Sequence, residues 1–348
     1  MAENIEPHVG ITGIGVYIPE GRMSAEEIAE KTEGEWEPWA VKEKLGIKEK
    51  VVPGENDGTQ AMGVAAAREA VESADVDPKD IDIVLGIGEE WKEYPLTTSS
   101  IYIQEQVGAK NAWAIDVQQR CGTTVAALKL AEDLLLGNQE YNKVLIAGGY
   151  RNIDLVDYSD PELSMMYNLA AAGGALIVEK NCKRNVLEGT HLISDGSMAR
   201  DVGVKVGGVA EPATPENAEE AYTLRMFDVE HMKTRLEEVS IDNWLYCIEQ
   251  AFSKAGRSQE EMDYLAVLHF KPSMHEFLLD QLNLSSDQTT YLDNYGHTGQ
   301  IDQILSLKLG LENGKVKPGS IISMISAGIG YAWAANVIKW GDINNKGG

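Results

Sequence analysis

The sequence predicts an α/β fold in which strands and helices alternate along the chain. Short apolar runs with β-branched residues and glycine, such as 9–19 and 142–150, are typical of buried strands. Stretches with helical periodicity, such as 59–74 and 228–255, lie between such runs. This alternation is the pattern of a doubly wound sheet covered by helices.

Two parts of similar length and element order indicate a duplicated unit. Residues 1–180 are expected to form the N-terminal half, which closes with a strand at 173–180. Residues 181–348 are expected to form the C-terminal half, with an irregular opening at 181–223 and two strands at its end. A chain of 348 residues is too long for one small core, so two packed halves are the natural arrangement.

Composition limits the partners and the compartment. The chain has 55 acidic and 30 basic residues and a formal charge of -25, which argues against nucleic acid or an anionic membrane as a partner. The acidic N-terminus and the lack of an apolar run of about 18 residues indicate neither a signal peptide nor a membrane span. Cys121, Cys182 and Cys247 are far apart and odd in number, so neither a disulfide framework nor a metal site is expected. A cytoplasmic protein is therefore expected.

Cys121 stands where a nucleophile could be activated. It follows a predicted strand at 112–118 and opens a predicted helix at 121–137. The unpaired N–H groups and positive end of a helix favour a thiolate. The first two turns of this helix are apolar nearly all round, which indicates a buried helix with the thiol at the bottom of a pocket. By position alone, Cys121 could equally be a small buried apolar side chain.

Three further features accompany Cys121. His269 ends an apolar strand, and His297 lies in a turn flanked by glycines, so both side chains are presented rather than buried within an element. The run 327–330, which ends in Gly330, could bring backbone N–H groups to an oxyanion. Each feature alone could also be structural, but together they indicate an acyl-transfer site.

The sequence also resembles a known family nearly end to end. The resemblance is carried by GITGIGVYIPEGRMS, LGIKEKVVP, DIDIVLGIG, DVQQRCGTTVAALKLAEDLL, VLIAGGY, AAAGGALIVE, LHFKPSMHEFLLDQL, NYGHTGQ and GIGYAWAANVIKW. These segments resemble the β-ketoacyl-ACP synthase III group of thiolase-fold condensing enzymes, with archaeal-type HMG-CoA synthases as cousins. The resemblance implies a five-layer αβαβα fold built from two duplicated halves, a homodimer, and a tunnel for pantetheine. It also implies acyl-CoA or acyl carrier protein thioesters as substrates, with no cofactor besides them.

By this resemblance Cys121 is the acylated nucleophile and His269 helps to bind and polarise the second substrate. His297 stands where the family has an asparagine in a Tyr-Gly-Asn-Thr motif. It could replace the asparagine as a hydrogen-bond donor, or act as a base, which an amide cannot do. The oxyanion donors would be the amides of Cys121 and Gly330. The family's His-Gln-Ala-Asn stretch is replaced here by His269-Phe270-Lys271-Pro272, which removes a second asparagine.

The resemblance also suggests residues for CoA. A tryptophan could stack on adenine and basic side chains could meet phosphates; the candidates are Trp36, Trp39, Lys42, Lys44, Lys48, Lys50 and Arg151. An ordinary helix and loop of mixed charge explains the same segment.

Glu89 and Glu90 follow a predicted strand near the place where the HMG-CoA synthase cousins keep a catalytic glutamate. A solvated acidic loop is expected for both, whereas a carboxylate in the pocket would indicate carbanion chemistry without decarboxylation. His275, on the helix after His269, is expected at the surface.

The leading hypothesis is an acyltransferase that loads an acyl group from acyl-CoA onto Cys121 and condenses it with a malonyl or other acyl thioester. The first alternative is transfer of the acyl group to an alcohol or amine, and the second is condensation without decarboxylation, as in HMG-CoA synthase. A different class of protein, a non-catalytic partner subunit of a thiolase-fold complex, is disfavoured because Cys121 and His269 are retained.

Overall fold

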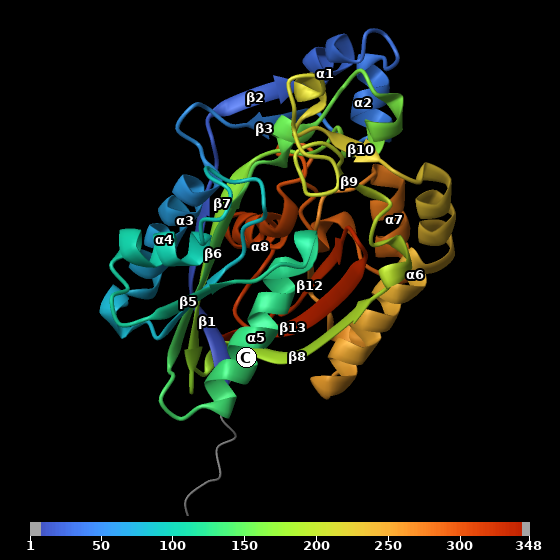
Figure 1. Cartoon of the computed structure of the whole chain (residues 1–348). Helices are drawn as coiled ribbons and strands as arrows, with labels where there is room; N and C mark the ends of the chain where they lie inside the picture. The colour runs from blue at the N-terminus through green and yellow to red at the C-terminus, as the bar shows by residue number, and fades with distance from the viewer. Residues whose placement is uncertain (1–7, 343–348) are drawn as a thin grey trace, which may run out of the picture.

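The computed structural model describes residues 8–342, which form thirteen strands and eight helices (Figure 1). The strands are β1 Val9–Tyr17, β2 Gly21–Ser24, β3 Glu49–Val52, β4 Ile83–Gly86, β5 Trp113–Asp116, β6 Lys143–Tyr150, β7 Ala172–Lys180, β8 Arg184–Ser194, β9 Val202–Val204, β10 Leu224–Met226, β11 Tyr264–Val267, β12 Ile321–Gly328 and β13 Ala332–Asp342. The helices are α1 Ala25–Lys31, α2 Pro38–Lys44, α3 Thr59–Ala74, α4 Ser99–Val107, α5 Thr123–Gly137, α6 Val229–Lys254, α7 Pro272–Gln281 and α8 Asp302–Glu312.

Nine strands form one large sheet in the order β11-β12-β13-β8-β1-β7-β6-β4-β5. The sheet is mixed: β4 runs parallel to β5 and β6, whereas β1 and β6 are antiparallel to β7. One residue pair, Gly10 with Val186, joins β1 to β8. The strands on one side of this junction precede residue 181 and those on the other side follow it. The predicted α/β fold class is confirmed, while the assignment of 1–180 and 181–348 as duplicated halves stays a prediction.

Helices α5 and α8 form the layer between the two sides of the sheet (Figure 1). α5 contacts β6 and β7 on one side and β12 and β13 on the other, and α8 contacts β7 and β11. Because α5 is enclosed on both sides, its Val125, Leu128 and Leu135 are fully buried. Each such side chain contributes roughly 1.5–3 kcal/mol of burial free energy. The layer places the N-terminal ends of α5 and α8 in the interior.

The outer helices complete the layers. α3 packs on β1, β6 and β7, and α6, the longest helix at 26 residues, packs on β8 and β13. Within residues 8–342, no helix is long and apolar enough to cross a membrane.

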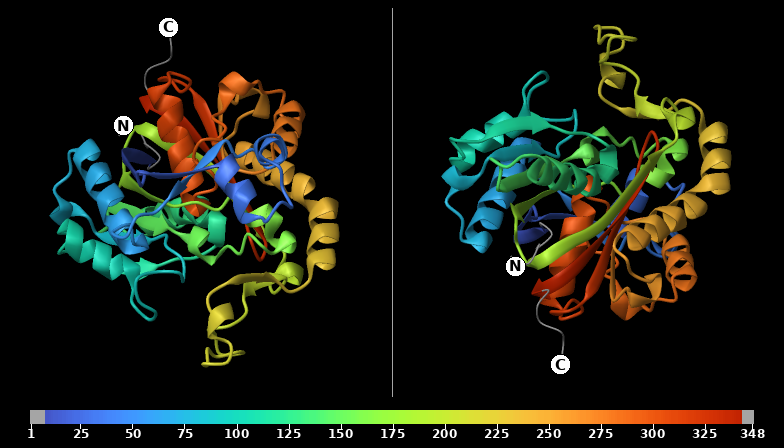
Figure 2. Two further views of the ribbon diagram at one scale, coloured as in Figure 1. Left: turned by 90° about the horizontal axis from the view of Figure 1, so that it is seen from above. Right: turned by 90° about the horizontal axis from the view of Figure 1, so that it is seen from below.

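The opening of the second part, expected to be irregular, contains the 11-residue strand β8. Its sequence, RNVLEGTHLIS, is polar and carries a glycine, so its own preference for a strand is weak. Pairing with β13 along most of its length stabilises it instead. The short strands β9 and β10 then pair with each other, and the segment between them projects from the body of the molecule (Figure 2).

Candidate active site

Cys121 lies in a tight turn between β5 and α5. A 3-10 turn, Arg120–Gly122, comes first and α5 begins only at Thr123, so Cys121 precedes the α-helix rather than opening it. Arg120 has a φ of 53°, and the Thr123 hydroxyl accepts from the Gln119 N–H at 2.8 Å and donates to the Arg120 carbonyl at 2.6 Å. These contacts hold the thiol, which is 5% exposed, at a fixed place.

Cys121, His297 and Asp302 form a continuous line of polar contacts. The Cys121 Sγ lies 3.1 Å from Nε2 of His297, and the His297 Nδ1 lies 2.5 Å from Oδ2 of Asp302. The other carboxylate oxygen of Asp302 accepts from the N–H and the hydroxyl of Thr298, at 2.7 and 2.6 Å. A nucleophile, a histidine and an orienting carboxylate in this geometry are the arrangement that activates a thiol for acyl transfer.

The charges in this line support one another. Burial alone would lower the pKa of His297, but Asp302 and Cys121 outweigh burial and raise it well above its ordinary value. Burial alone would raise the pKa of Asp302, but His297 and Thr298 hold it below its ordinary value. These contacts favour the imidazolium form of His297, in which one ring nitrogen donates toward Cys121 and the other to Asp302.

His269 has different contacts. It follows β11, and its backbone N–H donates to Oδ2 of Asp302 at 2.7 Å. Its Nε2 lies 3.0 Å from the Gly46 carbonyl and its Nδ1 lies 3.0 Å from the amide nitrogen of Asn168. Both ring nitrogens are thus occupied by the protein, and burial lowers the pKa of the imidazole. The structure does not bring this ring into contact with Cys121, and its role with a second substrate stays a prediction.

Glu89 is buried in the cavity that contains Cys121, whereas Glu90 lies at its rim. Only 6% of Glu89 is exposed, and its Oε2 accepts from the Asn152 amide at 2.6 Å and lies 4.0 Å from the Arg120 guanidinium. Burial raises the pKa of this carboxyl despite Arg120. Glu90 forms an ion pair with Arg120 and is largely exposed. The solvated loop expected for both glutamates therefore describes only Glu90.

The cavity has a volume of about 640 Å³, which is in the range of a small-molecule site. Its lining includes Cys121 and Tyr150, residues 89–93 and Pro95. Strands β9 and β10 and the segment between them also line it, with Val202, Val204, Gly207, Tyr222 and Leu224. Tyr222 lies beside Trp91, with 5.6 Å between the ring centroids, so these two parts of the lining are in contact.

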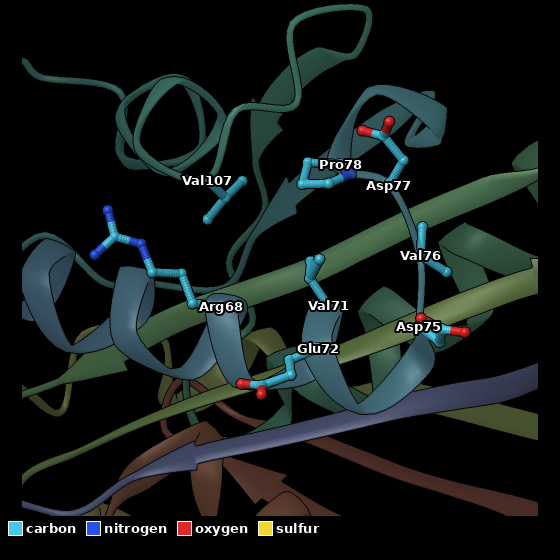
Figure 3. Close-up of a pocket in the computed structure, with 8 residues that line it drawn as sticks. All are labelled: Arg68, Val71, Glu72, Asp75, Val76, Asp77, Pro78 and Val107. Atoms are coloured by element: carbon cyan, nitrogen blue, oxygen red, sulfur yellow. The ribbon is translucent and has the colours of Figure 1, made fainter.

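A second hollow, of about 360 Å³, lies at the surface near the C-terminal end of α3 (Figure 3). Arg68, Glu72, Asp75 and Asp77 surround it, and Val107 of α4 forms its far side. It contains none of the predicted site residues. The Cys121 cavity is therefore the candidate active site.

The residues predicted to bind CoA do not line the Cys121 cavity. Trp39 is 57% exposed, with the Lys44 ammonium 5.3 Å from its ring centroid, and Trp36 packs against the core. Arg151 pairs with Asp154 at 2.6 Å and donates to two backbone carbonyls. Contact of Trp36, Trp39, Lys44 and Arg151 with CoA stays a prediction, whereas the fully buried Lys50 cannot reach a phosphate.

Two other predictions from the sequence concern Gly330 and His275. Ile329, next to Gly330, lines the cavity, and the role of the Gly330 amide as an oxyanion donor stays a prediction. His275 is not at the surface: it is 6% exposed and packs against the rings of Phe270 and Tyr291. That expectation was wrong because α7 turns this face toward the segments that carry Phe270 and Tyr291.

Several polar residues of the site were not singled out from the sequence. Asp302 follows His297 by five residues, a spacing that could have suggested the pair if 298–301 had been read as a tight turn before α8. Asn152 and Asn168 approach Glu89 and His269 from segments distant in sequence, so no local pattern indicates them. Among residues 8–342, no cluster of histidine, cysteine and acidic side chains could hold a metal ion.

Comparisons with known proteins point to one family. The sequence model described as 3-Oxoacyl-[acyl-carrier-protein (ACP)] synthase III matches residues 115–196, and the model of its C terminal matches 252–340. A β-ketoacyl-[acyl-carrier-protein] synthase III from Syntrophomonas wolfei is 25% identical over 337 residues, covering 96% of this chain and 98% of the relative.

Solved structures agree in fold. The 3-oxoacyl-[acyl-carrier-protein] synthase III from Aquifex aeolicus superposes with a TM-score of 0.80 at 22% identity, covering 95% of this chain and all of that one. The priming β-ketosynthase of the R1128 polyketide pathway gives a TM-score of 0.82 at 21% identity, covering 96% of this chain and 97% of that one.

Proposed function

We propose that this chain is a β-ketoacyl-ACP synthase III-like enzyme of the thiolase superfamily, and that it condenses two acyl thioesters through a covalent intermediate on Cys121. The observation that carries the proposal is the line Cys121–His297–Asp302, with the buried Glu89 in the same cavity. The first group of residues suits formation of an acyl-enzyme, and Glu89 suits generation of the second nucleophile.

In the first half-reaction the Cys121 thiolate attacks the carbonyl carbon of an acyl thioester. The bond from that carbon to the carrier sulfur breaks, and the departing thiolate takes the proton from Nε2 of His297. Asp302 keeps the ring oriented throughout and stabilises its charged form. The products are a thioester on Cys121 and a free carrier thiol.

In the second half-reaction Glu89 removes a proton from the α-carbon of a second acyl thioester. A carboxyl whose pKa is raised by burial is a stronger base than an ordinary glutamate once it is ionised. The resulting carbanion attacks the acyl group on Cys121, forms the new carbon–carbon bond and releases the Cys121 thiolate. After both half-reactions Glu89 has gained one proton and His297 has lost one. The enzyme is back in its starting state once Glu89 has released its proton and His297 has taken one up.

A malonyl thioester would instead lose carbon dioxide and would need no base. Its carboxylate would have to lie in the cavity that already contains Glu89, where like charges repel, and the nearby guanidinium of Arg120 is already paired with Glu90. The geometry therefore favours condensation without decarboxylation.

Transfer to an alcohol or amine is the second candidate. It is favoured by His297 itself, because a histidine paired with a carboxylate can deprotonate a hydroxyl when it is neutral. This reaction shares the first half-reaction and differs in the product.

The remaining features of the proposal concern assembly and compartment. The donor is acyl-CoA or an acyl carrier protein. The edge strand β5 exposes Trp113 and Ile115, and α4 beside it exposes Ile101 and Tyr102, which suits pairing of two copies into a homodimer. Three unpaired cysteines suit the reducing cytoplasm.

The test is product analysis by mass spectrometry after a panel of acyl-CoAs is mixed with one of three partners. These partners are a second acyl-CoA, malonyl-CoA or malonyl-ACP, and a panel of alcohols and amines. We expect a β-keto thioester with the second acyl-CoA. Product only with the malonyl donors would show decarboxylation, and an ester or amide as the sole product would replace condensation by simple transfer.

A further inference from the structure

Lys50 is a buried cationic side chain without an acidic partner. It lies on β3 and is fully buried, and no carboxylate of residues 8–342 forms an ion pair with it. A lysine is rarely buried in this way, because removal of its charge from water costs several kcal/mol unless partners compensate. Burial accordingly lowers the pKa of its ammonium well below the ordinary value. A residue kept at this cost needs an explanation, and phosphate binding is excluded because solvent does not reach it.

The three partners of Lys50 identify what it holds. Its Nζ donates to the Tyr158 hydroxyl at 2.6 Å, the Tyr167 carbonyl at 2.6 Å and the Leu169 carbonyl at 2.7 Å. The two carbonyls belong to the residues on either side of Asn168. Lys50 therefore fixes the backbone of Asn168 from both sides.

Asn168 in turn contacts both histidines of the site. Its side-chain amide donates to Nδ1 of His269 at 3.0 Å, and its carbonyl accepts from the backbone N–H of His297 at 2.7 Å. The His297 carbonyl also accepts from the N–H of Ala170, at 2.9 Å. The segment held by Lys50 is thus paired directly with the turn that carries His297.

The strand that carries Lys50 also contacts that turn. The N–H of Val51 donates to the Tyr295 carbonyl at 3.0 Å. Gly296 packs so closely that an added Cβ would lie 2.7 Å from the Asn168 carbonyl oxygen and 2.8 Å from the Lys50 Cβ. With a φ of 74° it also has a backbone that favours glycine. The turn before His297 is therefore enclosed between β3 and residue 168.

We propose that Lys50 is a positioning residue, which sets the place of His297 against Cys121 and Asp302 by fixing the segment around Asn168. It touches neither substrate nor the reacting atoms. The inference rests on the proposed function for its consequence, because a displaced His297 would slow acylation of Cys121. The position of His297 relative to Asp302, in contrast, can be measured without turnover.

The experiment replaces Lys50 by methionine, which is unbranched and one atom shorter and which removes the donors. The pH at which the His297 ring titrates is followed by NMR with labelled histidine, and the rate of Cys121 acylation is measured in a single turnover. We expect Lys50→Met to lower the titration point of His297 by about one unit, a tenfold change in proton affinity, and to slow acylation at least tenfold. A mutation that only lowered the free energy of unfolding would leave the titration midpoint of His297 in the folded protein unchanged.

The matched control is Lys31→Met. Lys31 is exposed and lies 5.9 Å from the centroid of the Tyr158 ring, so it shares a neighbour with Lys50 but donates to neither carbonyl. It should leave both measurements at their wild-type values. If Lys50→Met fails to fold, Tyr158→Phe removes one of the three acceptors at almost constant volume and should give a smaller shift in the same direction.

Wild-type titration of His297 in folded Lys50→Met, or in Tyr158→Phe if the first variant does not fold, would overturn the proposal. If His297 shifts as expected but wild-type protein forms no acyl-enzyme, the positioning role stands and the proposed function fails. The two failures are therefore distinguishable.

Discussion

His297 and His269 are both buried and both depend on Asp302, yet their surroundings give them opposite properties. Oδ2 of Asp302 accepts from the imidazole of His297 but only from the backbone N–H of His269. The pKa of His297 is raised and that of His269 is lowered. The same carboxylate thus favours the charged form of the histidine beside the nucleophile, whereas burial favours the neutral form of the other histidine.

The difference shows that position along a sequence motif does not define a histidine's role. His269 has both nitrogens engaged by Gly46 and Asn168, whereas His297 points one nitrogen at the thiol. These contacts support the proposal that His297 acts in acylation, whereas a direct role for His269 requires a bound substrate to displace Gly46 or Asn168 from its ring. Replacing Asp302 or His269 tests this contrast, and replacing Glu89 or His275 tests two other buried ionisable groups.

Asp302→Asn should lower acylation of Cys121 by about 10³- to 10⁴-fold, because the amide cannot stabilise an imidazolium. Asp302 raises the pKa of His297, so the variant should lose the charged form at a lower pH than wild type. Single-turnover acylation as a function of pH checks both effects. Asp293→Asn, which removes an ion pair with Lys48 and does not contact His297, is the control. Equal acylation in Asp302→Asn and wild type would contradict the role of the pair.

Glu89→Gln should reduce condensation by about 10²- to 10⁴-fold and leave acylation intact. Because burial raises its pKa, Glu89 acts as a base only above the ordinary titration range of a glutamate, so the acidic limb of wild-type condensation should lie above about pH 4.3. Product formation and acyl-enzyme formation are measured separately. Glu90→Gln should have a much smaller effect, and a loss as large as that of Glu89→Gln would remove the distinction between the two carboxylates.

His269→Gln should slow condensation by only about tenfold and acylation less, because its ring makes hydrogen bonds to the protein rather than to Cys121. His297→Gln, which loses the contact with the thiol, should slow acylation far more. Single-turnover rates of the two variants give the comparison directly. If His269→Gln proves the more damaging in acylation, the contrast between the histidines is reversed.

His275→Phe should make the protein less sensitive to acid. Burial lowers the pKa of His275 to about 4, so between pH 6.5 and 4 the unfolded chain binds a proton that the folded protein excludes. Wild type should therefore lose up to about 3 kcal/mol of stability from this residue as the pH falls through that window. Urea unfolding of both proteins at several pH values checks it. A pH dependence identical in the two proteins would show that His275 does not contribute.

Much of the fold could be predicted from the sequence, because the spacing of apolar residues indicates whether a segment is a helix or a strand. The helices at 59–74 and 228–255 appear almost as expected, as α3 and α6. β8 was missed because its pairing with β13, not its own residues, makes it a strand. The edge of the sheet at β5 could be placed only once the order of the strands was known.

Some residues of the site could likewise be identified from the sequence, and others only from the structure. Cys121 and His297 could be identified because glycines and strand ends mark their turns, and the structure brings them within 3.1 Å. The contacts of Lys50 with residues 167 and 169 and of Asn168 with two histidines join segments more than 100 residues apart, and Asn152 meets Glu89 from 63 residues away. A buried lysine and an exposed one look alike in a single sequence, so Lys50 was grouped with the phosphate-binding candidates.

The central claim is that Cys121 becomes acylated, and intact-protein mass spectrometry after incubation with a panel of acyl-CoAs tests it most directly. Wild type should gain the mass of one acyl group, and Cys121→Ala, which is expected to fold normally, should gain none. An equal adduct in Cys121→Ala, or no adduct on wild type with any donor, would contradict the account.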